Sequence, residues 1–207
     1  MTKDWTGNGN SIYMSLGASN HSNSDREDND FYATHPESVQ MFLDRISKDD
    51  DIKLPNNIYE CACGEGHISK KLIENKYNVF STDLIDRGFG NLHNIDFINN
   101  DLKDIDKKYF DCIITNPPYK YALDFVKKAN SITNKYTIMF LKIQFLEGKQ
   151  RYNYYKNYPP KFIYIHSSRV GCGKNGGNEF NNSGAVCYSW FIWEKNYKGD
   201  PIIRFIE

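Results

Sequence analysis

The sequence contains no apolar run that approaches the roughly 18 residues needed to cross a membrane. Its first five residues also lack the apolar segment of a signal peptide, so we expect a cytoplasmic protein with no membrane partner. No internal repeat is visible either. The 207 residues therefore fit one α/β domain with room for a substantial core.

Paired cysteines are also missing. Five cysteines is an odd number without the spacing of a small disulfide-bonded domain, which indicates reduced thiols. Cys61 and Cys63 alternate along a predicted strand, and Cys112 and Cys187 lie in apolar runs, so they fit buried small side chains better than metal ligands. Because no C-x-x-C pair occurs, the sequence predicts no metal site.

A net charge is absent too, since 26 Lys and Arg balance 26 Asp and Glu. The two signs are nevertheless separated along the chain. Residues 1–106 hold 10 basic and 19 acidic residues, a balance of −9, whereas residues 107–207 hold 16 and 7, a balance of +9. This asymmetry indicates a polyanionic partner.

The chain begins with a polar arm and continues with alternating strands and helices. Residues 1–30 are rich in Asn, Ser, Gly and Asp and cannot form a core alone, whereas residues 31–207 are predicted to form the single domain. Apolar runs and helical periodicity predict strands at 57–63, 78–84, 110–115, 136–145, 162–168 and 186–193, and helices from residue 36 and at 67–76, 121–132 and 148–158. This alternation predicts a mostly parallel sheet with helices on both faces. No helix separates the last two strands, so we expect an antiparallel pair at one edge.

A glycine-containing turn follows the first predicted strand. Gly64 and Gly66 allow a sharp turn and a close approach of the backbone to a ligand, at the strand ends where open α/β sheets bind ligands. By itself this pattern fits a tight connection at least equally well. Asp83 ends the next strand, where a carboxylate can accept hydrogen bonds from a ribose diol, although a lone Asp there is more often a turn former. Together the two features indicate a nucleoside-containing cofactor.

The tetrapeptide Asn116-Pro117-Pro118-Tyr119 follows a buried predicted strand. Its two prolines fix the path by which the chain leaves the strand. The Asn116 side-chain oxygen and nearby backbone carbonyls can then converge on a planar NH2 group, while Tyr119 offers a flat face for stacking. A proline-stiffened loop with a core tyrosine is the alternative, but the position at the ligand-binding edge favours a functional role.

The order of these motifs, Glu-x-x-Cys-Gly-x-Gly, strand-end Asp and then Asn-Pro-Pro-Tyr, resembles the class I S-adenosylmethionine-dependent amino-methyltransferases, especially the DNA adenine-N6 type. Residues 31–34 are similar to the motif that packs against the methionine end of the cofactor. Residues 140–151, 158–161 and 188–195 resemble compact phage and prophage methyltransferases. The resemblance implies a Rossmann-like fold with a mostly parallel seven-stranded sheet, S-adenosylmethionine as cofactor and double-stranded DNA as partner.

The resemblance also implies two sets of site residues. The catalytic set is Asn116, Pro117, Pro118 and Tyr119, which would hold and stack on a flipped-out adenine. The cofactor set is Phe31, Tyr32 and Thr34 for the methionine end, Glu60, Cys61, Ala62, Cys63, Gly64 and Gly66 for the loop, Asp83 for the ribose, and Leu84, Asp96 and Phe97 for the adenine ring. Asp101 is an alternative to Asp96 for the contact with the adenine ring of the cofactor.

Substrate contacts are predicted in the basic half. Lys149 and Arg151 lie among tyrosines, a pattern that suits phosphate contacts and stacking, although a solvated helix packed on the sheet fits equally well. Arg169 and Lys174 belong to a Gly/Asn-rich segment, residues 168–185, which we expect to be the substrate loop.

The substrate itself stays open at this point, because Asn-Pro-Pro-Tyr also occurs in RNA base methyltransferases and in enzymes that methylate glutamine in release factors. The basic half favours nucleic acid over protein, and the order of the motifs favours DNA over RNA. An inactive nucleic-acid-binding subunit is a further alternative, although such a subunit has no chemical need for Asn116 or Tyr119.

Overall fold

The computed structural model describes residues 32–100, 102–168, 170, 172–174 and 186–207. The predicted arm, Phe31, Asp101, Arg169 and most of the predicted substrate loop lie outside these residues. Within the described part of the chain, no helix is both long enough and apolar enough to cross a membrane.

Seven strands form the main sheet, in the order β3-β2-β4-β5-β8-β6-β9. Their bounds are β2 Asn57–Glu60, β3 Asn78–Ser81, β4 Cys112–Thr115, β5 Tyr136–Lys142, β6 Phe162–His166, β8 Tyr188–Glu194 and β9 Ile202–Ile206. Strands β3, β2, β4 and β5 are parallel, β8 runs antiparallel to both β5 and β6, and β9 is parallel to β6. The mostly parallel seven-stranded sheet with an antiparallel pair is therefore confirmed.

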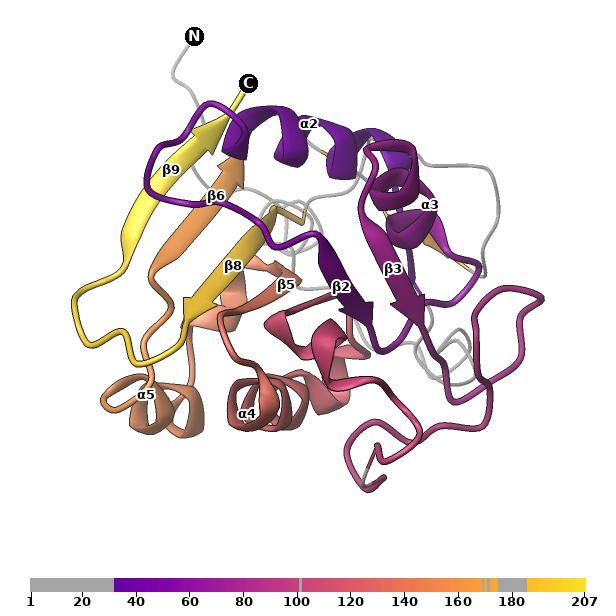
Figure 1. Ribbon diagram of the computed structural model, residues 1–207. Coiled ribbons are helices and arrows are strands. Elements are labelled where there is room, and N and C mark those ends of the chain that lie inside the picture. The colour runs from indigo at the N-terminus through magenta and orange to yellow at the C-terminus, as the bar shows by residue number, and fades with distance from the viewer. Residues whose placement is uncertain (1–31, 101, 169, 171, 175–185) are drawn as a thin grey trace, which may run out of the picture.

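Helices cover both faces of this sheet (Figure 1). Helices α2, Pro36–Ile46, and α3, His67–Glu74, lie on one face, and α4, Ala122–Ile132, and α5, Lys149–Tyr155, lie on the other. Among the described residues, three short 3-10 helices connect elements: η2 Lys107–Asp111, η3 Tyr119–Tyr121 and η4 Ile143–Leu146. The predicted strand at 136–145 ends early because η4 turns the chain away from the sheet at its carboxyl edge.

The two faces of the sheet bury separate apolar layers. Under α2 and α3, Phe42 stacks on Trp190 with ring centroids 4.5 Å apart, and Phe140 lies next to the same indole at 4.7 Å. Under α4 and α5, Met139 and Phe191 belong to the second layer. Because both faces are covered, the central strands carry apolar residues at nearly every position, which explains their short continuous apolar runs.

Strand β9 extends the sheet beyond the antiparallel pair and was not predicted. Ile203 and Phe205 are exposed on it, and only Ile206 is buried, so its sequence lacks a clear burial pattern. Its place depends on pairing with β6, a contact between distant parts of the chain that no local pattern records.

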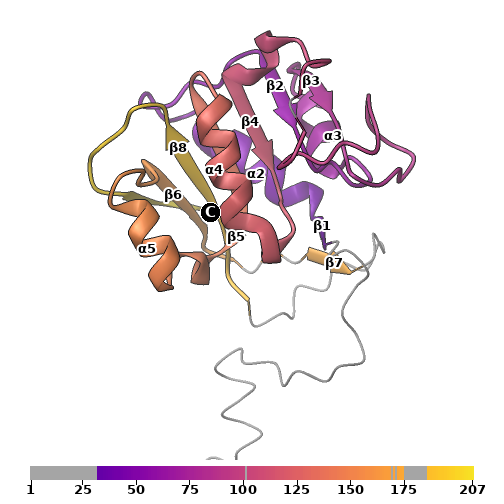
Figure 2. The same ribbon diagram turned by 90° about the horizontal axis from the view of Figure 1, so that it is seen from below.

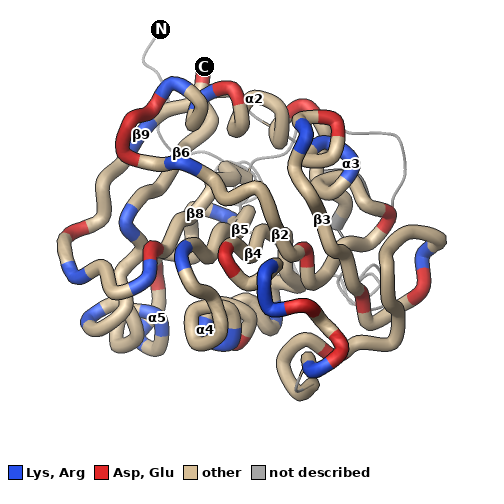
Figure 3. The backbone as a smooth tube through the Cα atoms, viewed as in Figure 1, with Lys and Arg blue, Asp and Glu red and all other residues tan. Residues whose placement is uncertain are grey.

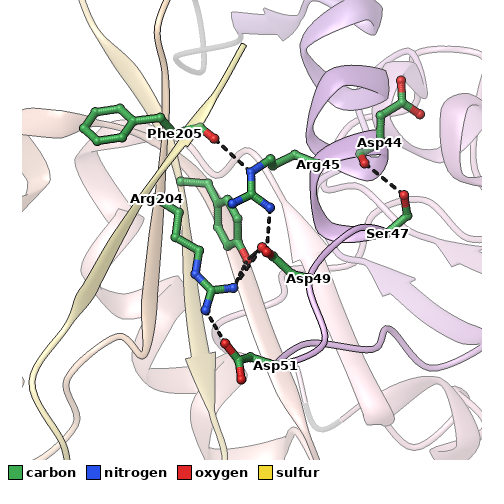
Figure 4. Close-up of polar contacts among 8 residues, drawn as sticks. Asp44, Arg45, Ser47, Asp49, Asp51, Arg204 and Phe205 are labelled. Atoms are coloured by element: carbon green, nitrogen blue, oxygen red, sulfur yellow. Dashed lines mark hydrogen bonds and ion pairs between the residues drawn. The ribbon is translucent and has the colours of Figure 1, made fainter.

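Ion pairs fasten β9 to the connection between α2 and β2 (Figure 4). Arg204 pairs with Asp49 at 2.9 Å and also with Asp51, while Arg45 pairs with Asp49 at 2.6 Å. The Tyr164 hydroxyl donates to the Asp49 carboxylate as well. Burial alone would raise the pKa of Asp49, but the hydrogen bonds from Arg45, Tyr164 and Arg204 lower it. Ion pairs thus join β9, the last strand, to helix α2 and the connection that follows it.

A separate two-stranded sheet lies beside the main one (Figure 2). Strand β1, Tyr32–Thr34, pairs antiparallel with β7, Cys172–Lys174, so that Tyr32 is opposite Lys174 and Thr34 is opposite Cys172. We refer to this pair as the β1–β7 ribbon. It joins the motif predicted to hold the methionine end of a cofactor to the segment predicted to form a substrate loop.

Candidate functional site

The carboxyl ends of β2, β3, β4 and β5 lie at one edge of the sheet because these strands are parallel. The Gly64–Gly66 turn, Asp83 and Asn116 follow three of these ends. At 3.5 Å, the Thr115 hydroxyl donates to the Ala62 carbonyl, which joins the end of β4 to the turn after β2. The parallel topology therefore brings the predicted cofactor and catalytic motifs to one edge.

Backbone donors from two segments, the turn after β2 and the connection after β3, hold the Asp83 carboxylate. The Gly64 N–H donates to Oδ2 at 2.7 Å, and the Ile85 N–H donates to Oδ1 at 2.9 Å. Each carboxylate oxygen has a second acceptor position, so both can still bind hydroxyl groups. Leu84, next in the chain, is exposed. This arrangement suits a ribose diol at Asp83 with an apolar side chain beside it.

Two separate structural features require glycine at position 66. Its φ of 81° lies in the left-handed region, and a Cβ at this position would overlap the ring of Phe89. The Lys70 ammonium lies 5.1 Å from the centroid of the same ring. Sequence reasoning missed Phe89, because no local signal shows that residue 89 returns to the turn at residue 66.

Glu60 lies beneath the turn with 1% of its surface exposed. It accepts a hydrogen bond from the Ser69 hydroxyl of α3, and Ser69 and Ser81 share a hydrogen bond of 2.6 Å. Burial raises the pKa of Glu60 to about 8, so the carboxyl is mainly neutral at pH 7. Burial likewise raises the pKa values of Cys61 and Cys63. These three side chains support the turn from inside the fold.

Asp96 and Phe97 lie in different surroundings from Asp83. Asp96 accepts hydrogen bonds from the N–H and side-chain amide of Asn99, and the side-chain bond leads the effects that lower the pKa of Asp96. Phe97 is 2% exposed and packs against the Phe125 ring at 5.1 Å. Asp96 thus stabilises a turn and Phe97 belongs to the core, while their predicted contact with an adenine ring stays a prediction.

Asn116 is joined to the β1–β7 ribbon by a hydrogen bond. Its side-chain Nδ2 donates to Thr34 Oγ1 at 3.0 Å. Thr34 is only 3% exposed, and Pro117 is also buried. Thr34 and Asn116 were predicted for different roles, yet the structure places their side chains in contact.

A lysine ammonium lies over the ring of Tyr119. The Lys142 ammonium lies 4.2 Å from the Tyr119 ring centroid, and the Tyr188 ring lies 6.3 Å from it. Lys142 ends β5 and is the strand partner of Tyr188 in β8. Sequence reasoning missed Lys142, although a lysine at the carboxyl end of an apolar strand could have indicated it.

The remaining predicted contact residues lie on two elements. Lys149 is exposed at the start of α5, whereas Arg151 braces the preceding turn: its guanidinium lies 5.2 Å from the Phe145 centroid, and its Nε donates to the Glu147 carbonyl. Lys174 ends β7. Figure 3 shows basic residues along α5, which has no acidic residue, and both signs around α2 and α3. The charges are therefore partly separated and partly intermixed.

The residues described here contain no group of three or more His, Cys, Asp and Glu side chains placed to hold a metal ion. Cys61, Cys63, Cys112 and Cys187 are free thiols.

No protein-family model and no curated protein sequence matches the chain. Several solved structures share its fold. A candidate hemolysin from Lactococcus lactis matches with a TM-score of 0.55 at 11% identity, over 80% of this chain and 90% of that one. The M protein of the type I restriction enzyme EcoKI matches with a TM-score of 0.55 at 11% identity, over 84% of this chain and 46% of that one. A candidate RNA methyltransferase from Pyrococcus horikoshii matches with a TM-score of 0.54 at 12% identity, over 89% of this chain and 97% of that one.

The chain has the class I methyltransferase fold. At identities of 11–12%, this likeness concerns the fold alone. Function has to be argued from the site, because one fold hosts many activities.

Proposed function

We propose that the chain is an S-adenosylmethionine-dependent methyltransferase that acts on the N6 amino group of adenine in DNA. The observation that carries the proposal is that two groups of residues lie at the same edge of the sheet. The glycine turn and Asp83 form one group, and the segment that holds Asn116 and Tyr119 forms the other. One part offers donors and acceptors for a nucleoside, and the other offers a planar acceptor and an aromatic face.

The residues fit the cofactor. The Asp83 carboxylate has acceptor positions left for a ribose diol, and the left-handed glycines leave the turn without side chains where a ligand approaches. When bound, S-adenosylmethionine supplies an activated methyl group on a sulfonium. The chain must then align a nucleophile with this group and exclude water from it.

Asn116 and Tyr119 would prepare the target nitrogen. The lone pair of an exocyclic amino group is delocalised into the ring, which makes it a poor nucleophile. If the Asn116 Oδ1 and the Pro117 carbonyl each accept one N–H, the nitrogen becomes more pyramidal and its lone pair is freed for attack. Tyr119 would stack on the base, which is worth about 1–3 kcal/mol.

Lys142 supports a nucleic acid as the substrate. Its ammonium lies on the ring face of Tyr119, so a nucleotide entering here meets a cation that can bind its phosphate. A glutamine side chain in a protein has no such anion. Among the fold relatives, the EcoKI M protein belongs to a restriction enzyme, which favours DNA. RNA is the second candidate, because the Pyrococcus horikoshii protein matches nearly the whole of both chains.

Methyl transfer decides between these substrates. The full chain is incubated with tritiated S-adenosylmethionine and with duplex DNA, structured RNA or protein extract, followed by nucleoside and amino-acid analysis. We expect N6-methyladenine in DNA; methylated RNA bases or methylglutamine would overturn the choice of substrate.

Asn116→Ala should lower turnover by about 10²–10³-fold while cofactor binding survives. Asn134→Ala, an exposed asparagine that bonds Asp111 away from the site, is the matched control.

A further inference from the structure

A pocket with a volume of about 300 Å³ lies at the amino end of β5, at the opposite edge of the sheet from Asn116 and the glycine turn. Its buried lining includes Thr133, Thr137 and Trp193, the strand partner of Thr137, and each of the three is at most 3% exposed. Pockets for small molecules begin at about this size. The pocket is therefore separate from the candidate catalytic edge and has room for a ligand of its own.

Two lysines in the lining are held by backbone carbonyls. The Lys195 ammonium donates to two carbonyls in the last turn of α4, at 3.1 and 3.5 Å. The Lys198 ammonium donates to the Asn157 carbonyl at 2.7 Å and lies 5.1 Å from the centroid of the Tyr158 ring. An ammonium group has three donors, so each lysine can also donate to a ligand. Because these contacts already restrict both side chains, a ligand loses less affinity to their ordering.

The charge of this lining favours an anion. Glu194 is part of the lining, but it is paired with Lys161 and so does not cancel the charges of Lys195 and Lys198. A phosphate monoester carries about −1.5 to −2 charges at pH 7 and has three acceptor oxygens, so it matches two ammonium groups. A carboxylate or a phosphodiester carries less charge and fits the pair less well.

The pocket also has aromatic and apolar walls. Tyr158, Pro159 and Tyr197 line it, and Tyr158 is 54% exposed. The Tyr154 ring stacks on Tyr158 with centroids 5.1 Å apart, and Lys198 lies next to the same ring, so the Tyr158 wall is held in place. A bare phosphate ion would leave these walls in contact with water, whereas a nucleoside attached to the phosphate would cover them.

We propose that this pocket binds the phosphate monoester of a nucleotide, with Lys195 and Lys198 donating to the phosphate and the nucleoside lying against the aromatic walls. A free mononucleotide and the 5′-phosphate end of a nucleic-acid strand both present this group. The site goes beyond the proposed methyl transfer, because it lies at the other edge of the sheet and needs neither the cofactor nor a target base. Its failure would leave the proposed function standing, and the reverse also holds.

The indole N–H of Trp193 reports on the pocket, since it donates to the Tyr158 carbonyl at 3.2 Å. Its nuclear magnetic resonance signal in the full-length protein is identified by its loss in Trp193→Phe and is followed during titrations. The probes are thymidine 5′-monophosphate, thymidine and inorganic phosphate. Thymine has no exocyclic amino group, so these probes do not compete for the proposed target site. We expect a saturable shift with the monophosphate and at least about tenfold weaker binding of the other two, each of which lacks one half of the ligand.

A short thymidine oligonucleotide, with and without a 5′-phosphate, distinguishes the two sources. Tighter binding of the phosphorylated strand than of the mononucleotide would assign the site to a strand end, and equal or weaker binding would assign it to a free nucleotide. The proposal is overturned if neither phosphorylated probe shifts the signal. It is also overturned if thymidine, inorganic phosphate or the unphosphorylated strand binds as tightly as its phosphorylated counterpart.

Lys198→Met tests the contact itself. It should weaken binding of the monophosphate by about tenfold, as expected for a lost charge-assisted hydrogen bond, whereas Lys198→Arg should keep most of the affinity. Lys198 is exposed and does not contact a helix end, so the variant should fold as the wild type does. Lys71→Met is the matched control, because it removes the same charge from a lysine paired with Glu74 on α3. Wild-type affinity in Lys198→Met, or an equal loss in Lys71→Met, would contradict the proposed site.

Discussion

His166 ends β6 with its side chain 5% exposed, and among the residues that the structure describes neither of its ring nitrogens has a hydrogen-bond partner. Its nearest aromatic neighbour is Phe140, whose ring centroid lies 6.2 Å away in an edge arrangement. Burial lowers the pKa of His166 to about 4. The imidazole is therefore neutral in the folded protein, although the unfolded chain takes up a proton near pH 6.5.

This difference predicts a pH dependence of stability. Because the unfolded state binds the proton more tightly, the free energy of unfolding should fall as the pH drops from about 6.5 to about 4, by about 3 kcal/mol in total. His166→Leu should remove this part of the slope and should raise stability at pH 8, since two unpaired polar atoms leave the core. Denaturant unfolding from pH 4 to 8 measures both. An unchanged slope in the variant would assign the pH dependence to other groups.

Gly66 gives a second prediction for a single residue. Gly66→Ala should destabilise the fold and weaken cofactor binding, because the new methyl group combines a left-handed backbone with an overlap on Phe89. Gly88→Ala is the control: its φ is similar, 78°, but a Cβ there meets open space. The free energy of unfolding of Gly88→Ala should fall by only about 1–2 kcal/mol, the strain of the left-handed conformation. Denaturant unfolding should show a clearly larger fall for Gly66→Ala. Equal losses would mean that Phe89 moves aside without cost.

Ion pairs add to the pairing with β6 in holding strand β9 in the sheet. Arg204→Ala removes charge-assisted hydrogen bonds to Asp49 and Asp51, and we expect a loss of about 2 kcal/mol in the free energy of unfolding. Asp49 keeps Arg45, which limits the loss. As a control, Lys127→Ala breaks an exposed pair with Asp124 and should cost less than about 0.5 kcal/mol. Similar losses in the two variants would contradict a special role for Arg204.

The elements that could be predicted from the sequence are those whose own residues carry the signal. Strand β5 and helix α4 are buried along a continuous run or one face, so their apolar periodicity predicts them. Strand β9 and the β1–β7 ribbon lack such a local signal, and their places depend on partners far away in the chain.

The same holds at the site. Gly64, Asp83 and Asn116 stand at strand ends and could be predicted, because parallel topology alone brings strand ends together. The contacts of Thr34 with Asn116 and of Lys142 with Tyr119 depend on side-chain placement across separate elements, which spacing does not encode.

For the whole molecule, the balance of charges predicts how nucleic acid would bind. Lys149 in α5 and Lys156 just after it are exposed, and the Lys156 ammonium lies 4.7 Å from the ring centroid of exposed Tyr152. The double variant Lys149→Ala/Lys156→Ala should weaken binding to a labelled DNA duplex. It should also lower the slope of log affinity against log salt by about 1 for each lysine that contacts a phosphate.

Fluorescence anisotropy at several salt concentrations makes this measurement. Lys71→Ala on α3, a lysine already paired with Glu74, is the control and should leave the slope unchanged. If the α5 variant also keeps the wild-type slope, α5 is a solvated helix whose tyrosines pack on the sheet.

The β1–β7 ribbon should be less stable than the main sheet beside it. Two strands of three residues are too few to hold together without outside contacts, whereas the seven-stranded sheet is anchored by two apolar layers. The ribbon therefore depends for its stability on the burial of Ala33 and Thr34 and on the Thr34–Asn116 hydrogen bond. Hydrogen exchange should show this as faster exchange of β1 amides than of β5 amides, and Thr34→Val should widen the difference.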